Sequence, residues 1–249
     1  MGVPLRSKNR RAIKLAEQLA QEIVADIERT GMAPGDRFPS EVVMAQARGV
    51  SRASLREALR ILEVHGLIII RPGPGGGPEL AELTAQDFAR TATLHFHRAG
   101  ATFKQLLDAR VVLEPRLAQL AAMKRSPEQV QALRANLLEH EGAEDAEELM
   151  HFAHEFHALV ADMAGNGNQV LSLTSSSLHG IFDVYQREGR TVGAMRETVS
   201  VHRDIADAVE AGDADKAARL MEEHMQASAE TFAREHPTLI DRRVSWLSV

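Results

Sequence analysis

The stretch SRASLREALR, residues 51–60, decides how the rest of the chain is interpreted. In and just after it, leucines recur at i, i+4 and i+7 and form one apolar helical stripe that must be buried: Leu55, Leu59 and Leu62. A different face carries arginines spaced every four residues: Arg52, Arg56 and Arg60. Ser51 is a natural N-cap, because its hydroxyl can accept a hydrogen bond from a backbone amide of the first turn. These features predict a short cationic helix with one buried face.

A second predicted helix precedes this one, within FPSEVVMAQARG at residues 38–49. Ser40 can cap its start and Gly49 can close its end, so that three or four residues separate the two helices. That spacing is typical of a helix-turn-helix, in which the second helix reads DNA. A basic amphipathic helix is also common as a solvated surface, and the two helices alone fit either interpretation.

The residues that follow predict a wing. Gly66 can end the cationic helix, and LIII at residues 67–70 is a short β-branched run. The segment RPGPGGGP, residues 71–78, is too rich in glycine and proline for a helix, and Glu79–Leu80 can return as a strand. With a long first helix expected over Arg10–Thr30, this order predicts a mostly α fold that begins with a winged helix-turn-helix and a small β wing.

The segment GDRFPSEVVMAQARGVSRASLREALRILEVHGLI, residues 35–68, resembles the DNA-binding domain of the GntR family of bacterial transcriptional regulators. The likeness covers about residues 11–80 and rests on PSE, GVSR, LREAL and the LxxxGLI ending. It implies a sequence-specific DNA-binding regulator, expected to be a repressor and not an enzyme. Such a protein is expected to bind an inverted-repeat operator as a homodimer.

The resemblance also implies a set of residues that face DNA: Arg37, Arg52, Ser54, Arg56, Arg71 and Gly73. Arg52 and Arg56 match arginines that contact operator bases and phosphates, and the arginine fork pairs with guanine O6 and N7. Ser54 can donate to a phosphate. Val42 departs from the arginine that the family commonly has after PSE, a loss that the arginines flanking the wing partly replace. Gly73 is included because glycine lets a wing approach the minor groove closely, although glycine there can equally just make the turn.

Composition fits two domains with different partners. The chain of 249 residues exceeds one typical domain, contains no cysteine and has no apolar run of 18 residues. Its start, MGVPLRSKNRR, lacks the apolar region of a signal peptide, so a cytoplasmic location without membrane contact is expected. Residues 1–79 hold 12 Lys and Arg against 9 Asp and Glu, whereas residues 80–249 hold 17 against 26. A locally basic domain can still bind DNA, because salt screens charges beyond about 8–10 Å.

From residue 84 onward the sequence predicts an antiparallel all-α bundle of six or seven helices with short loops. The expected helices are Thr84–Arg98, Thr102–Lys124 with a local interruption at Pro115, Ser126 to about His140, Glu144–Ala164, Gln169–Glu188, Thr191–Ala211 and Ala214–Glu235. The predicted domains are residues 10–80 for DNA binding and residues 84–236 for effector binding and dimerisation. Residues 237–249 are expected to form a C-terminal tail without a clear pattern.

Three segments of this half resemble the ligand-binding bundle of the FadR branch of the GntR family: LLDARVVLEPRLAQLAA (106–122), EFHALVADMAGN (155–166) and VHRDIADAVEAGDADKAARLMEEHM (201–225). Many members of that branch bind a divalent metal through three histidines and an aspartate, close to a carboxylate effector. The matching histidines are His157, His202 and His224. Neutral imidazoles suit a borderline metal such as Zn or Ni, which is the cofactor that the resemblance implies.

The effector site carries one departure and one ambiguity. Ala153 stands where the family usually has the aspartate, and His154, about 100° further round the helix, is a poorer substitute. The histidines are therefore expected either to hold a metal together with water or effector, or to hold none and shape a polar pocket. Arg110 matches the arginine of the family's R-x-x-L-E pattern and suits capture of a carboxylate, although an ion pair with Glu114 explains it equally well. Asn166, which ends the second matching segment, is the other predicted effector-binding residue.

The remaining histidines have ordinary interpretations. His140 is placed at a helix end, where the helix dipole favours a cation, and His179 is expected to be a surface or half-buried residue. A histidine cluster also fits a metal-dependent hydrolase with Glu155 or Asp204 as general base, or a metal or ligand carrier. Against a hydrolase, the sequence has no HExxH pattern, and the nearest acids lie beside the histidines instead of one turn away.

Overall fold

The computed structural model describes residues 7–73, 75–165, 169–186 and 192–246. Its contacts divide the chain into two compact units, and the division falls between Asp87 and Phe88. The elements of the first unit are α1 (Ser7–Thr30), α2 (Glu41–Ala47), α3 (Arg52–Val64), β1 (Ile68–Arg71) and β2 (Gly77–Leu80). The elements of the second unit are α4 (Ala85–Ala99), which spans the division, α5 (Phe103–Lys124), α6 (Pro127–Gly142), α7 (Ala146–Gly165), α8 (Gln169–Gln186), α9 (Val192–Ala211) and α10 (Ala214–Glu235).

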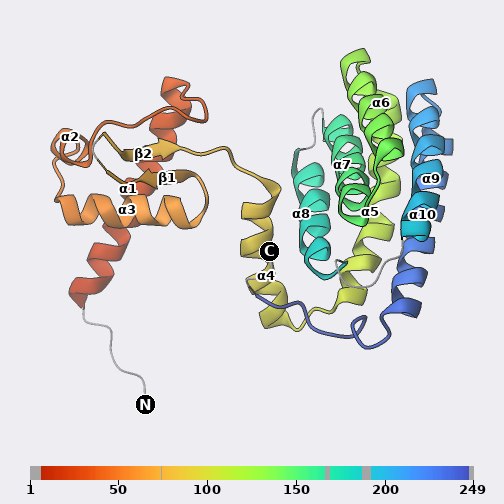
Figure 1. The fold of residues 1–249 in the computed structure, drawn as a ribbon. Coiled ribbons are helices and arrows are strands. Elements are labelled where there is room, and N and C mark those ends of the chain that lie inside the picture. The colour runs from red at the N-terminus through yellow and green to blue at the C-terminus, as the bar shows by residue number, and fades with distance from the viewer. Residues whose placement is uncertain (1–6, 74, 166–168, 187–191, 247–249) are drawn as a thin grey trace. The chain divides into compact units, whose positions relative to one another are not determined.

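The first unit has the winged helix-turn-helix order that the sequence predicts (Figure 1). Ser40 caps α2 and Ser51 caps α3, each by accepting a hydrogen bond from the backbone amide three residues on. Strands β1 and β2 pair antiparallel, with Ile68 opposite Leu80. The caps and the glycine-rich turn are local signals, and they correctly predict where these short elements begin.

The core of the first unit explains why α3 presents its arginines outward. The leucine stripe of α3 packs against the buried face of α1, around residues that include Leu19, Ile23 and Met44. Leu55 and Leu59 are almost fully buried, and each such side chain contributes about 1.5–3 kcal/mol to stability. Because this stripe faces the core, the arginines of the opposite face are left exposed to solvent.

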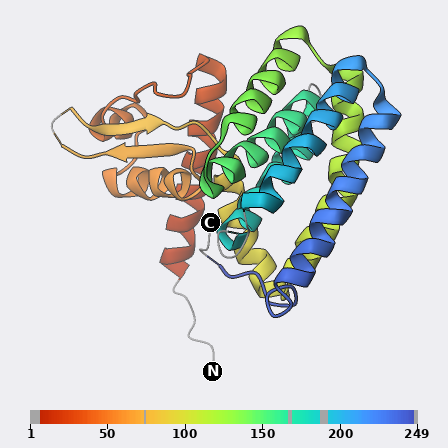
Figure 2. The same cartoon turned by 45° about the vertical axis from the view of Figure 1, so that its right-hand side comes forward.

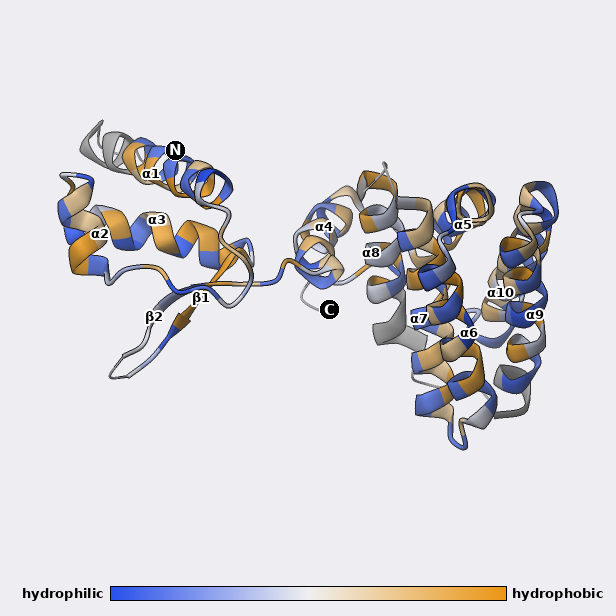
Figure 3. Ribbon diagram, turned by 90° about the horizontal axis from the view of Figure 1, so that it is seen from above, coloured by the Kyte–Doolittle hydropathy of each residue, from blue (hydrophilic) through white to orange (hydrophobic). Residues whose placement is uncertain are grey.

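The second unit is an all-α bundle in which α5 contacts α7, α8, α9 and α10. Figures 1 and 2 show helices α5 to α10 side by side, and Figure 3 shows hydrophilic and hydrophobic residues alternating along them. The largest core cluster is built from α5, α6, α7, α9 and α10, around Phe156 and Ile205. No helix among the described residues is both long enough and apolar enough to cross a membrane.

Several helix boundaries differ from the predicted ones. Helix α1 begins at Ser7 instead of residue 10, since residues 7–9 contain no glycine or proline that would interrupt a helix. Helix α5 runs through Pro115 without a break, because proline removes only one helical hydrogen bond and packing on both sides of it holds the helix. Helix α7 begins at Ala146 because the Asp145 carboxylate accepts hydrogen bonds from the backbone amides of Glu147 and Glu148. The predicted boundaries at residues 188 and 191 lie outside the described residues.

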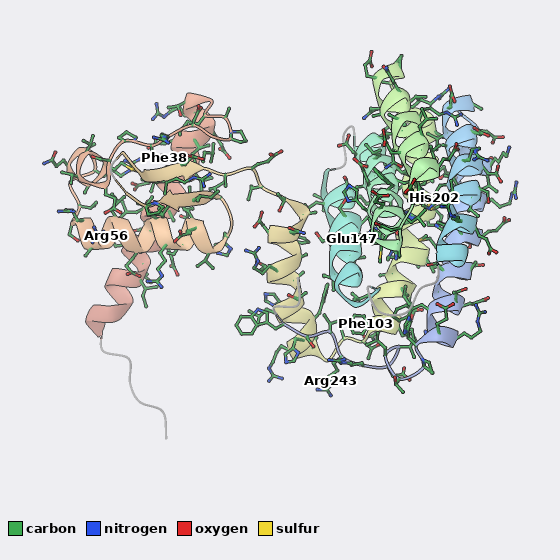
Figure 4. All side chains as sticks on the ribbon, in the orientation of Figure 1. Phe38, Arg56, Phe103, Glu147, His202 and Arg243 are labelled. Atoms are coloured by element: carbon green, nitrogen blue, oxygen red, sulfur yellow. The ribbon has the colours of Figure 1, made fainter. Side chains whose placement is uncertain are left out.

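The chain after α10 packs against the corner between α4 and α5. The Val244 amide donates to the Ala101 carbonyl at 2.9 Å, and the Phe103 amide donates to the Arg242 carbonyl at 3.2 Å. Val244 is fully buried in the cluster that contains Phe103, whereas Trp246 is half exposed. Figure 4 shows Phe103 and Arg243 near each other at this corner. Residues 237–246 are therefore a docked part of the second unit.

Candidate functional site

The outer face of α3 is the candidate DNA-binding surface. Arg52, Arg56 and Arg60 are all exposed, and Figure 4 shows Arg56 on this helix. The Arg56 Nε donates to the Glu41 Oε2 of α2 at 2.6 Å, so that this guanidinium is held across the helix-turn-helix. Ser54 is half-buried, and its hydroxyl lies 2.9 Å from the Ser51 hydroxyl, so Ser54 also takes part in capping the helix.

The base of the wing holds two more of the predicted DNA-facing arginines. Arg37 donates to the Gly75 carbonyl at 3.0 Å, and its Nε lies 3.7 Å from the Glu79 carboxylate. Arg71 donates to the other oxygen of Glu79 at 3.2 Å. Both guanidiniums remain more than half exposed, so a half-buried carboxylate orients them without covering them.

The wing glycines are needed for the turn itself. Gly73 has φ +94°, in the left-handed region that glycine adopts without strain. A Cβ on Gly76 would lie 2.2 Å from the Arg71 carbonyl oxygen, closer than any side chain permits. The turn-forming interpretation of these glycines therefore holds, and it leaves the approach to the minor groove as a prediction.

A pocket of about 260 Å³ opens between α5, α7, α9 and α10 of the second unit. Its lining includes three histidines from three helices: His157 of α7, His202 of α9 and His224 of α10. Arg110 of α5 also lines it, as do Ala153 and His154. The structure thus brings together the predicted histidines and the predicted effector-binding arginine, while Asn166 lies outside the described residues.

The three histidines converge through one nitrogen each. The His202 Nε2 lies 3.1 Å from the His224 Nε2, which lies 3.3 Å from the His157 Nε2. Burial lowers the pKa of His202 well below its usual range, and the neighbouring His224 and His157 lower it further. Burial also lowers the pKa of His157, an effect that Glu114 opposes only partly. Both rings are therefore neutral at pH 7, the form in which imidazole binds metals.

Behind these histidines lies a buried carboxylate, Glu114 of α5. Its Oε2 lies 2.5 Å from the His157 Nδ1, and its Oε1 accepts from the Arg110 Nε at 2.8 Å. The ion pair that the sequence allows between Arg110 and Glu114 is therefore formed, and Arg110 lines the pocket as well. Burial by itself would raise the pKa of Glu114, but the Arg110 guanidinium and the contact with the His157 Nδ1 hold it well below its usual range.

Two histidines are placed differently from their predicted positions. His179 is buried, and its Nε2 lies 2.5 Å from the Arg110 Nη2, so the prediction of an ordinary surface or half-buried residue is wrong. His140 is buried beside His202, with ring centroids 5.4 Å apart, and burial lowers its pKa. Burial destabilises the charged form of the ring by more than the helix dipole stabilises it, so the predicted cation at this position is also wrong.

The sequence held only part of the signal for this network. The four-residue spacing of Arg110 and Glu114 on one helix predicts that an ion pair can form between them. Nothing local connects His179 to them, because the contact depends on how α8 packs against α5.

The residues proposed for hydrolysis lie away from the pocket. Glu155 is exposed and accepts a hydrogen bond from Asn136 at 2.9 Å, and Asp204 is exposed on α9. Neither residue lines the pocket. A general base must reach the reacting atoms, so neither of the two acids named for the hydrolase alternative is placed to act. The acids that do line the pocket are Glu197 and Glu235.

Two family descriptions match the chain. The FCD domain matches residues 105–227, and "Bacterial regulatory proteins, gntR family" matches residues 15–76. The HTH-type transcriptional regulator LutR of Bacillus subtilis (strain 168) is 30% identical over 206 residues, which cover 80% of this chain and 92% of that protein. The putative L-lactate dehydrogenase operon regulatory protein of Escherichia coli (strain K12) is 27% identical over 232 residues, 89% of this chain and 87% of that one. A solved structure of Streptococcus agalactiae GntR shares the fold, with a TM-score of 0.63 at 23% identity, and covers 86% of this chain and 99% of its own.

Proposed function

This chain belongs to the gntR family of bacterial regulatory proteins, and we propose that it represses transcription from an inverted-repeat operator as a homodimer. It is a transcriptional regulator with an N-terminal gntR helix-turn-helix domain and a C-terminal FCD effector-binding domain. The finer proposal is that a small carboxylate in the bundle pocket controls the affinity for operator DNA, with a divalent metal on the three histidines. Residues 10–80 and 84–236 are the proposed functional domains.

The exposed cationic face of α3 is the observation that carries the DNA-binding proposal. Arg52 is exposed and forms no ion pair with another described residue, so it can enter a major groove without losing an internal partner. Arg56 exchanges its contact with Glu41 for a base or a phosphate. One such domain binds a half-site weakly. Two domains related by a two-fold axis bind both halves of an inverted repeat at once, which raises the overall affinity.

The pocket supports a small anionic effector. Arg110 reaches it from α5, and a guanidinium binds carboxylates through paired hydrogen bonds. A pocket of about 260 Å³ suits a small organic acid better than a long-chain ligand. One relative is named as a putative regulatory protein of an L-lactate dehydrogenase operon, and lactate is a small carboxylate.

The histidine cluster fits a tetrahedral metal such as zinc. Metal–nitrogen bonds of about 2.0–2.1 Å keep ligand nitrogens about 3.3–3.4 Å apart, close to the 3.1 and 3.3 Å that separate the Nε2 atoms. His157, His202 and His224 would hold the ion, and Ala153 contributes no ligand. When bound, the metal supplies an open coordination position for an effector oxygen. Arg110, on the same pocket, would bind the far end of the effector.

The DNA-binding proposal is tested by band shift with the promoter region of the chain's own gene. Arg52→Ala is expected to cost about 1–3 kcal/mol of operator affinity and to relax base preference at one position in each half-site. Arg219→Ala, which removes an exposed arginine of α10, is the matched control and should leave affinity unchanged. Parental binding by both Arg52→Ala and Arg56→Ala would refute α3 as the recognition helix.

The metal proposal is tested separately by elemental analysis and calorimetric titration with zinc. The parent protein is expected to bind one ion, and a His202→Ala, His224→Ala double variant is expected to bind none. Equal metal content in both proteins would leave the histidines as a polar pocket without metal.

A further inference from the structure

We propose that Glu114 is a positioning residue shared by the two halves of the pocket: it fixes the tautomer of His157 and the orientation of Arg110 at the same time. The inference rests on the proposed function, in which His157 holds a metal and Arg110 holds an effector carboxylate. It adds a residue that touches neither ligand and joins the two binding groups through one side chain.

The geometry assigns a separate oxygen of Glu114 to each group. The Oε2 lies 2.5 Å from the His157 Nδ1, and the Oε1 accepts from the Arg110 Nε at 2.8 Å. The side chain of Glu114 is 3% exposed and that of His157 is 4% exposed, so water does not compete for these contacts. Both partners are therefore oriented by the same rigid carboxylate.

The contact with His157 decides which ring nitrogen carries hydrogen. An ionised carboxylate accepts hydrogen bonds and repels a lone pair, so the His157 Nδ1, 2.5 Å from the Glu114 Oε2, carries the hydrogen. In a neutral imidazole the other nitrogen, Nε2, then carries a lone pair. That lone pair points to the place where the Nε2 atoms of His202 and His224 converge. Glu114 thereby selects the tautomer of His157 that can bind a metal.

The contact with Arg110 is reinforced from α8. The His179 Nδ1 lies 3.2 Å from the Ser175 carbonyl, which only accepts, so that Nδ1 carries the hydrogen. The His179 Nε2 is then an acceptor for the Arg110 Nη2 at 2.5 Å. Donor atoms of Glu114, His157 and His179 lie within 4.8 Å of one another, a spacing that would also suit a cation. The guanidinium of Arg110 already supplies that positive charge, which assigns this group to orientation and not to a second metal.

Glutamine at position 114 separates the two roles of the carboxylate, because an amide has one accepting atom and one donating group. If its oxygen faces the His157 Nδ1, its NH2 group meets the donating Arg110 Nε. If its NH2 group faces His157, the Nδ1 must accept, and the hydrogen moves to Nε2, where it blocks the metal-binding lone pair. Glu114→Gln keeps the shape of the side chain and cannot satisfy both neighbours.

The test uses the full-length protein with zinc as the probe. Glu114→Gln is expected to weaken zinc binding about 10–100-fold, the usual effect of losing a carboxylate behind a metal-binding histidine. Glu210→Gln is the matched control, because Glu210 also accepts from an arginine Nε at 2.8 Å but lies on the exposed face of α9. Zinc affinity of the control is expected to stay within twofold of the parent. Equal zinc affinity of Glu114→Gln and the parent would overturn the proposal.

A second measurement needs neither a variant nor a metal. Two-bond proton–nitrogen NMR spectra of the metal-free parent at pH 7.5 report the tautomer of each histidine, with His157 assigned by comparison with His157→Gln. The Nδ1–H form of His157 is expected. The Nε2–H form would refute the role of Glu114 even if zinc binds. If zinc does not bind the parent, the metal part of the proposed function fails, and the tautomer still decides the role of Glu114.

Discussion

Lowering the pH from 7.0 to 5.5 is expected to destabilise the C-terminal unit by about 2.5 kcal/mol in the absence of metal. Burial lowers the pKa of His179 and of His202 well below the ordinary value of 6.5, so both stay neutral in the folded protein. In the unfolded chain they take up protons once the pH falls below 6.5. The unfolded state then binds more protons than the folded state, so the free energy of unfolding falls as the pH falls.

The magnitude follows from two histidines that remain neutral only in the folded state. Each loses about 1.3 kcal/mol between pH 7.0 and 5.5 if its unfolded pKa is 6.5, which gives about 2.5 kcal/mol for the pair. The buried neighbours His140 and His157, whose pKa values are also lowered, add to this loss. Above about pH 8 these histidines contribute almost no further dependence, because the unfolded state is then neutral as well.

The measurement is urea-induced unfolding at both pH values with a chelator present. The chain has one tryptophan, and Trp246 lies in the segment docked on the second unit, so its fluorescence reports that unit. A His179→Gln, His202→Phe double variant is the control and should lose most of the pH dependence. Equal stability of the parent at pH 7.0 and 5.5 would refute the assignment of these rings as buried and neutral.

Three further outcomes are expected. Leu59→Ala removes methyl groups from the core of the first unit and should cost about 2–5 kcal/mol, measured as faster hydrogen exchange in residues 13–73 with the bundle unchanged. Ala153→Asp places a carboxylate in the pocket and should raise zinc affinity by about tenfold, or ~1.4 kcal/mol, over Ala153→Asn in calorimetric titration. Val244→Asp buries a charge that costs about 3–5 kcal/mol unless the segment detaches, so limited proteolysis should cleave after residue 236 faster than in the exposed control Val112→Asp.

The elements that the sequence predicts well are those set by neighbours along the chain. Ser40 and Ser51 cap their helices as expected, and Ser126 with Pro127 opens α6 as predicted. A cap is a contact between residues three apart, so its signal survives without knowledge of the fold. The helix order and the wing follow from the same kind of signal.

The candidate site could be predicted only where a family motif marked it. The family motifs predict three histidines on three separate helices, and the structure brings them together. The contacts of Glu114 with His157 and His179 join α5 to α7 and α8, and no spacing along the chain encodes such crossings. The docking of Val244 is equally remote in sequence from the corner that it covers, since about 140 residues separate them.

The docked segment after α10 changes what that helix is able to do mechanically. Helix α10 carries His224 in the pocket, and the chain that continues it is tied to the α4–α5 corner at Ala101, Phe103 and Lys104 by backbone hydrogen bonds of 2.9–3.2 Å. Close packing against α5 and α9 already resists sliding of α10 along its axis. Helix α10 is also anchored at its far end, so an axial displacement either lengthens those hydrogen bonds or moves the corner with it. A displacement of His224 along the axis of α10 is therefore opposed by the hydrogen bonds at the start of α5 as well as by the packing around the pocket.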